Sequence, residues 1–237
     1  MRLIDRLLRR APAAPLSEAA AARLSVWRQS PAAAPNRPLD AARLVVVDVE
    51  SSGLDVERDR LIAIGAVAVT GGRIDLADSL DIVLRQDEVS DRDNILVHGI
   101  GGQAQRTGVP PVEALLAFLE YLGPDPLVAF HVAFDAAMIG RAMRQHLGLC
   151  FEPAWADLAY VAPALYPREA RRLRGLDHWL KHFGIGNYAR HSALADALAT
   201  AELLLALRPA LETRRAHRFA DLRDLERTWR RQMHPVY

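Results

Sequence analysis

Apolar and polar positions divide the chain into an arm and a folded domain. The first 42 residues are rich in Ala and Pro, with two short stretches of helical spacing at residues 3–10 and 17–28. At Arg43 the pattern changes to a β-branched run, Leu44 to Glu50, which is too short for a helix. We therefore predict a partly helical N-terminal arm over residues 1–42, which ends in a Pro-rich linker.

Three predicted strands open the domain. The run at 44–50 is followed by a second strand at 61–70, LIAIGAVAVT, and Gly71-Gly72 turns the chain into a third at 73–84. The pattern is typical of an antiparallel meander.

Helices then alternate with short strands. Pro111 begins a helix that ends at Gly123-Pro124. Further strands are predicted at 127–130 and 155–157, and further helices at 133–147, 158–165, 176–183 and 192–207. This order predicts one α/β domain over residues 43–207, with a mixed β-sheet flanked by helices.

The last 30 residues carry regularly spaced arginines. They alternate with acids and with apolar residues that include Phe219, Leu222, Leu225 and Trp229. Residues 208–237 are predicted to form a basic amphipathic helix that lies against the domain or a partner.

The charge balance hides a strong asymmetry. The whole chain has 30 basic and 29 acidic side chains, for a net charge of +1. Residues 1–43 carry a net charge of +5, residues 44–207 of −8 and residues 208–237 of +4. An acidic centre lies between two basic arms.

Composition also excludes several classes of protein. Cys150 is the single cysteine, so intrachain disulfides and cysteine zinc sites are excluded. No apolar run approaches the roughly 18 to 20 residues that span a bilayer, and the N-terminus lacks the apolar core of a signal peptide. We expect no membrane association and a cytoplasmic location.

Asp48 and Glu50 are the strongest local anomaly. Side chains two apart in a strand share a face, so two carboxylates project together from an otherwise apolar strand. Such carboxylates repel each other, and a divalent cation with oxygen ligands would stabilise them. The alternative is that the strand ends at Val47 and both acids are solvated.

Two further motifs contain ionisable groups at predicted helix starts. If Ser192 is the N-cap of the last domain helix, His191 and Asp196 meet at that helix start, where the imidazole could accept a proton. Phe134 and Asp135 begin another helix. Each motif alone is also compatible with plain helix capping or core packing.

Together the motifs resemble the DEDDh exonucleases, the family that includes the proofreading ε subunit of bacterial DNA polymerase III. Order, type and spacing match at Asp48, Glu50, Asp135, His191 and Asp196, and the resemblance covers residues 43–207. It implies a ribonuclease H-like fold and two-metal 3′-to-5′ removal of nucleotides from DNA or RNA ends. The expected cofactors are two divalent cations, Mg²⁺ or Mn²⁺.

The resemblance also implies a role for each matching residue. Asp48, Glu50 and Asp196 would hold the first cation, Asp48 would bridge to the second, and Asp135 would act partly through water. His191 would be the general base. The nucleotide-contacting positions would be Ser51, Ser52, Gly53, Leu54, His98 and Phe134.

One motif departs from the family pattern. Members often have His-Asn-Ala-x-Phe-Asp, whereas this chain has Phe130 and His131 at the first two positions and keeps the acidic ligand, Asp135. The departure concerns substrate preference rather than activity. We do not assign Asp157 to the cations.

Three functions are compatible with these motifs. The first is a metal-dependent 3′-to-5′ exonuclease, acting on single-stranded DNA or, alternatively, on RNA. The second is a catalytically weak nucleic-acid-binding protein, and the third an interaction protein recruited to a DNA polymerase or another replication or repair partner. The oligomeric state stays open. A basic cluster either contacts the substrate backbone or is a solvated loop: Arg168, Arg171, Arg172 and Arg174.

Overall fold

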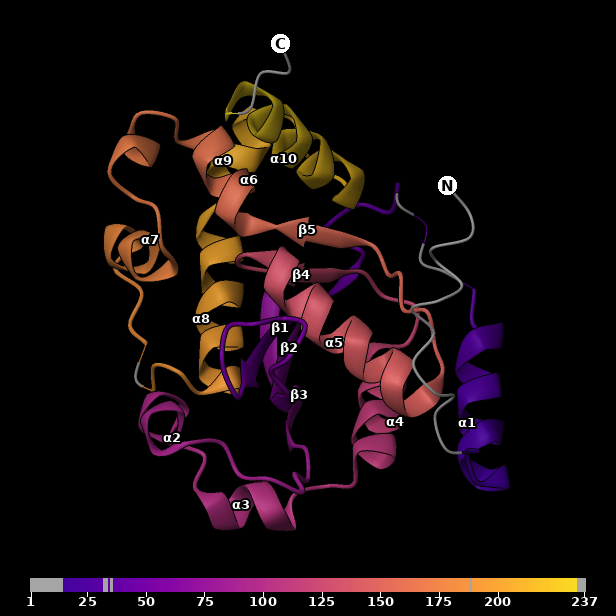
Figure 1. Cartoon of the computed structure of the whole chain (residues 1–237). Helices are drawn as coiled ribbons and strands as arrows, with labels where there is room; N and C mark the ends of the chain where they lie inside the picture. Colours follow the sequence, from indigo (N-terminus) through magenta and orange to yellow (C-terminus); the bar gives the residue numbers. More distant parts are fainter. Residues whose placement is uncertain (1–14, 32–33, 35, 188, 234–237) are drawn as a thin grey trace, which may run out of the picture.

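A single five-stranded sheet organises the protein. The computed structural model describes residues 15–31, 34, 36–187 and 189–233. The strands lie in the order β3-β2-β1-β4-β5, as Figure 1 shows. They are β1 (Arg43–Ser51), β2 (Leu61–Thr70), β3 (Arg73–Val83), β4 (Leu127–Ala129) and β5 (Trp155–Asp157). β1 to β3 form an antiparallel meander, β4 pairs in parallel with β1, and β5 pairs in parallel with β4. The predicted mixed α/β sheet is confirmed.

Helices cover both faces of this sheet, with α5 and α8 on opposite sides (Figure 1). In chain order the helices are α1 (Glu18–Gln29), α2 (Arg92–His98), α3 (Gly102–Thr107), α4 (Pro111–Leu122), α5 (Val132–Leu147), α6 (Leu158–Leu165), α7 (Leu176–Phe183), α8 (Ala193–Ala206), α9 (Arg208–Thr213) and α10 (Phe219–Met233). A short 3₁₀ helix, η2 (Glu169–Arg171), follows α6. Because helices cover both faces, nine of the ten β2 residues are buried.

The side chains of β1 alternate between two apolar cores. Val45, Val47 and Val49 pack with α4 and α5, whereas Leu44 and Val46 pack with α8. The next two positions of the second set are Asp48 and Glu50. Both acids lie within β1, which continues to Ser51, so the alternative of a strand that ends at Val47 is wrong.

A glycine in β2 brings α8 onto the sheet at this point. Gly65 pairs with Asp48 in the β1–β2 register. A Cβ atom at Gly65 would lie 2.1 Å from the backbone nitrogen of Leu194 and 2.2 Å from the backbone carbon of Ala193. Since only glycine lacks a Cβ, this residue allows the first turn of α8 to contact β2 directly.

Two regions differ from the predicted elements. Residues 92–107 form α2 and α3, which the sequence did not predict because they lack an apolar stripe; Leu96 and Val97 are exposed. The segment after Arg208 forms two helices rather than one, and Arg215 between them has a positive φ of 56°.

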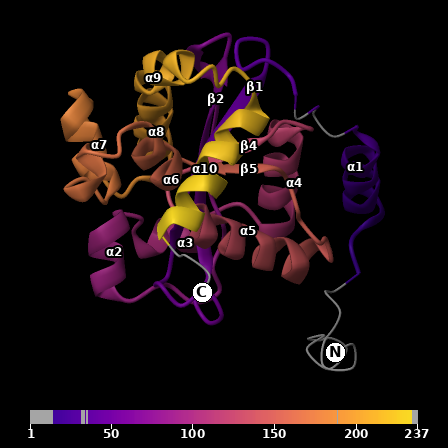
Figure 2. The same cartoon turned by 90° about the horizontal axis from the view of Figure 1, so that it is seen from above.

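Both terminal regions pack on the domain. α1 corresponds to the predicted stretch 17–28 and buries Ala20 and Leu24; the predicted stretch 3–10 lies outside the described residues. α10 buries Phe219 and Leu222 in the core on the α8 face, and Figure 2 shows it crossing over β5 while α1 lies at the side of the molecule. Within the described residues, no helix is long and apolar enough to cross a membrane.

Candidate active site

Three carboxylates from two elements meet where β1 ends. One oxygen each of Asp48, Glu50 and Asp196 lies within 4.8 Å of the others. Asp196 is 2% exposed and Glu50 is 9% exposed. Ser192 is the N-cap residue of α8, so Asp196 occupies the fourth helical position that the spacing predicted. We call these three residues, with Asp135, the acid cluster.

Asp135 reaches the cluster from the opposite face of the sheet. It lies in the first turn of α5 and is 4% exposed. Burial raises the pKa of Asp135 well above its ordinary value, while the backbone amides of Asp135 and Val49 oppose that rise. Because the backbone amide of Val49 acts on the Asp135 carboxylate, the start of α5 lies beside the end of β1.

The cluster is electrostatically strained. Burial raises the pKa of Asp48 well above its ordinary value, and the charges of Asp135, Asp196 and Glu50 raise it further. Burial and the charge of Asp196 raise the pKa of Glu50 to about 8. Closely held buried carboxylates become stable as anions when a cation joins them, and oxygen donors of this kind suit a hard divalent cation. The residues present therefore fit a metal centre.

Asp196 also has protein partners that the sequence did not predict. Its carboxylate accepts hydrogen bonds from the side-chain amide of Asn187 and the guanidinium of Arg190, and from the backbone N–H of His191 at 3.1 Å. Arg190 extends this contact to Asp177 of α7, at 2.7 Å. Asn187 and Arg190 lie in an irregular loop, where their only sequence signal is their closeness to His191.

His191 lies at the rim of the cluster. Its φ of 64° is left-handed, and the residue is exposed directly before the N-cap of α8. The backbone contact with Asp196 keeps this exposed residue beside the acids.

The turn after β1 presents an apolar tip next to the acids. The Ser51 hydroxyl donates to the carbonyl of Gly53 at 2.6 Å, and the Ser52 hydroxyl donates to Asp59 at 2.9 Å. These hydroxyls shape the turn, whose next residue, Leu54, is 88% exposed. A large exposed apolar side chain at this position is suited to contact with a base.

His98 and Phe134 occupy different environments. His98 ends α2 and is 5% exposed. Its ring contacts Asn94 at 2.8 Å and accepts from the Ile100 N–H at 2.9 Å, and Asn94 in turn donates to the carbonyl of Ser51. Phe134, in the first turn of α5, is partly buried against the core.

Comparison with known proteins agrees with this geometry. The model of the RNase T exonuclease family, described as exonuclease, matches residues 45–204. The chain belongs to this family.

Relatives of this exonuclease domain include replication proteins. The DNA polymerase III subunit epsilon of Aquifex aeolicus is 31% identical over 162 residues, which cover 68% of this chain and 78% of that protein. The DNA polymerase III PolC-type of Thermotoga maritima is 30% identical over 164 residues. Those residues cover 69% of this chain, which spans only 12% of that protein's length.

Solved structures share the fold of the exonuclease domain. E. coli Exonuclease I in complex with a dT13 oligonucleotide has a TM-score of 0.62 at 17% identity, covering 73% of this chain and 42% of that one. The predicted ribonuclease H-like fold is confirmed.

The basic cluster of the exonuclease domain lies away from the acids. Its four arginines flank or belong to η2, in the connection between α6 and α7, and all are exposed. Figure 1 shows this connection at the upper left, whereas Asp196 lies in the first turn of α8, at the lower end of that helix.

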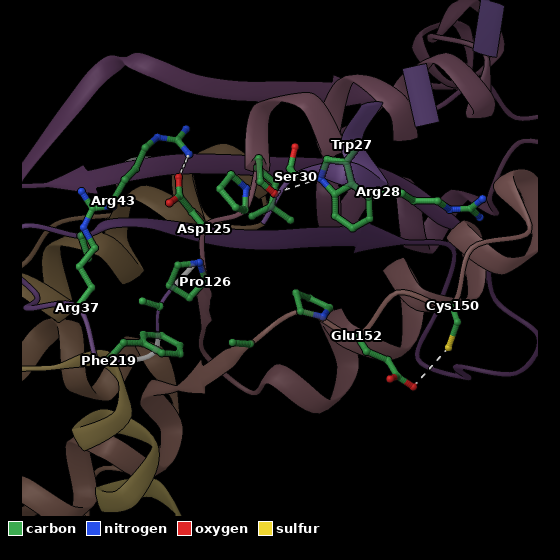
Figure 3. A pocket seen from close by; sticks show the side chains of 17 residues that line it. Trp27, Arg28, Ser30, Arg37, Arg43, Asp125, Pro126, Cys150, Glu152 and Phe219 are labelled. Carbon is green, nitrogen blue, oxygen red and sulfur yellow. Dashed lines mark hydrogen bonds and ion pairs between the residues drawn. The ribbon is translucent and has the colours of Figure 1, made fainter. Parts of the chain in front are cut away.

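A separate cavity lies at the other end of the sheet. It measures about 330 Å³ and lies between α1 and the loop before β4. Figure 3 shows Arg43 directed at Asp125, with the indole of Trp27 farther along the lining of the cavity. No member of the acid cluster lines this cavity, so it is separate from the candidate active site.

Proposed function

We propose that this chain hydrolyses single-stranded DNA from its 3′ end, with two divalent cations, Mg²⁺ or Mn²⁺, and releases nucleoside 5′-monophosphates. The observation that carries the proposal is the meeting of the Asp48, Glu50 and Asp196 oxygens within 4.8 Å. Membership of an exonuclease family supports the reaction. The oligonucleotide bound to Exonuclease I, a protein of the same fold, favours single-stranded DNA.

The acid cluster supplies the ligands. Asp48, Glu50 and Asp196 would hold one cation, and Asp48 and Asp135 the second. Two such cations, when bound, stabilise the charge on the attacking and leaving oxygens of the phosphodiester. Without them, the buried carboxylates would repel the phosphate.

His191 and the neighbouring apolar side chains would serve the water and the nucleotide. The exposed imidazole of His191 would take the proton of the attacking water. Leu54 and Phe134 would contact the terminal base, and the backbone of residues 51–53 its sugar. His98, held by Asn94, would support the turn from behind.

The test is a nuclease assay with matched variants. We expect purified protein to shorten a 5′-labelled single-stranded DNA one nucleotide at a time with Mg²⁺ or Mn²⁺, and not with a chelator. Asp196→Asn and His191→Gln should each remove most of this activity, whereas Arg227→Gln, which changes an exposed ion pair with Asp224 on α10, should not. Equal rates for the wild type and Asp196→Asn would contradict the proposed site.

An RNA 3′ end is the second candidate substrate, favoured by the name of the RNase T family. The same assay with RNA and DNA of one sequence decides between them by the ratio of kcat/KM values. The relatives' names also favour a DNA polymerase as a partner. Oligonucleotide binding without turnover would instead support the nucleic-acid-binding alternative.

A further inference from the structure

The C-terminal helix contacts the active-site region through one buried carboxylate, that of Asp157. This residue ends β5 and is 1% exposed. The Arg230 guanidinium donates to its carboxylate at 3.1 Å, and Glu226 accepts from its backbone N–H at 3.1 Å. Arg230 and Glu226 also pair with each other at 2.9 Å, one turn apart on α10.

The same carboxylate caps the start of α5. It accepts from the backbone N–H groups of His131 at 2.9 Å and Val132 at 3.2 Å. His131 is the N-cap residue of α5 but makes no side-chain capping bond of its own. Asp157 thus supplies from a neighbouring strand the anionic cap that the helix start requires.

The cap holds a strained backbone. His131 has φ 71° and ψ 51°, the left-handed conformation that non-glycine residues adopt only when their surroundings enforce it. Phe134 and Asp135 follow within one turn. The position of a proposed nucleotide contact and of a proposed cation ligand therefore depends on this junction.

Asp157 in turn depends on α10. Burial and the charge of Glu226 raise its pKa, while the amides of His131 and Ala159 and the charge of Arg230 oppose that rise. The Arg230 guanidinium is itself fixed 3.6 Å above the ring of Tyr160. A continuous series of contacts therefore links α10, through Asp157, to the first turn of α5.

We propose that Arg230 and Glu226 are positioning residues for the active site, which act through Asp157 on the β4–α5 junction. The proposal rests on the proposed exonuclease function for its activity readout. A second readout, amide hydrogen exchange, does not need activity or bound metal.

The experiment compares Arg230→Gln with Arg227→Gln in the full chain. Arg227 lies on the same helix and pairs with exposed Asp224 at 3.4 Å. In metal-free protein, Arg230→Gln should accelerate exchange of the His131 and Val132 amides at least tenfold, with α4 unchanged. Its kcat/KM on single-stranded DNA should fall about 10- to 100-fold, as for groups that orient metal ligands, and Arg227→Gln should change both by less than twofold.

Arg230→Lys keeps the positive charge and should restore part of both readouts, and it serves as the test if Arg230→Gln does not fold. Equal exchange at the junction in the Arg230 and Arg227 variants would overturn the proposal. A uniform rise in exchange across the chain would do the same, because it would mark a merely structural role. An inactive wild type with the expected exchange would instead contradict only the proposed function.

Discussion

Buried carboxylates lie at the ends of two parallel-aligned strands, β1 and β5, in opposite circumstances. Asp157 accepts three backbone hydrogen bonds and pairs with Arg230. Burial and neighbouring negative charges raise the pKa values of Asp48 and Glu50. In the described part of the chain, Arg190 is the cation whose charge lowers them. The donors around Asp157 mark it as part of the structure, whereas Asp48 and Glu50, which face the charge of Asp196 and lack such donors among the described residues, mark the place for a ligand.

The largest effect is expected from Asp48→Asn. It removes a ligand of both proposed cations, whose loss costs several kcal/mol of transition-state stabilisation, so kcat/KM should fall about 10³-fold. In a chelator its free energy of unfolding should equal or exceed that of the wild type, because repulsion within the cluster is relieved. Activity within tenfold of the wild type would contradict the role of Asp48 as a proposed cation ligand.

Asp48→Asn should lower activity without lowering stability, whereas Asp157→Ala should lower stability. It leaves buried amide donors of the β4–α5 junction and Arg230 without their partner, so the free energy of unfolding should fall by about 3 kcal/mol. Urea denaturation of the metal-free protein measures this loss. A variant as stable as the wild type would show that Asp157 is not structural.

Added metal should stabilise the protein only through the acid cluster. Mg²⁺ at about 100 times its Kd should raise the free energy of unfolding by about 2.7 kcal/mol. We expect this gain in the wild type and in Arg227→Gln, and its loss in Asp48→Asn. Thermal unfolding with Mg²⁺ or with a chelator gives the readout, and an equal gain in Asp48→Asn would place the metal elsewhere.

The metal-free protein should become less stable as the pH rises. The pKa of Glu50 is raised from 4.5 to about 8, so between these values the folded state binds more protons than the unfolded chain. Its free energy of unfolding should therefore fall from pH 5 to pH 8, by up to about 1.4 kcal/mol per pH unit for each proton. Glu50→Gln should reduce the slope, and the raised pKa values of Asp48, Asp135 and Asp157 should leave a remainder. If Glu50→Gln leaves the slope unchanged, Glu50 is not the source of this pH dependence.

The smallest effect is expected from two exposed ion pairs. Arg23 of α1 contacts Glu113 at 2.5 Å and Glu120 at 2.7 Å, and both glutamates are about half exposed. Arg23→Ala should lower the free energy of unfolding by less than about 1 kcal/mol, since solvent screens such pairs. Nuclease activity should stay unchanged in the same preparation, and a large loss would link α1 to the active site.

Local patterns in the sequence were sufficient for the sheet and most helices, whereas the meeting of Asp48 with Asp196 was expected only from the resemblance to an exonuclease family. Alternation places Asp48 on one face of β1, and the spacing from Ser192 places Asp196 in the first turn of α8. α2 and α3 escaped prediction because hydrogen bonds stabilise them: fully buried Gln105 accepts from the Ser90 N–H and donates to the Ile100 carbonyl.

Contacts between distant residues could not be predicted either. Arg230 lies 73 residues from Asp157, and no periodicity indicates that the last helix would contact the end of β5. Arg190 contacts Asp196 because of a loop conformation, which depends on the packing of α7.

The direct contact at Gly65 also sets the point during synthesis at which the active site can form. Asp48 and Glu50 leave the ribosome almost 150 residues before Asp196, and the three meet only after α8 has docked against Gly65. A chain whose synthesis has not yet passed α8 carries only part of the proposed cation ligands. The backbone contact that completes the core therefore delays nuclease chemistry until synthesis has passed α8.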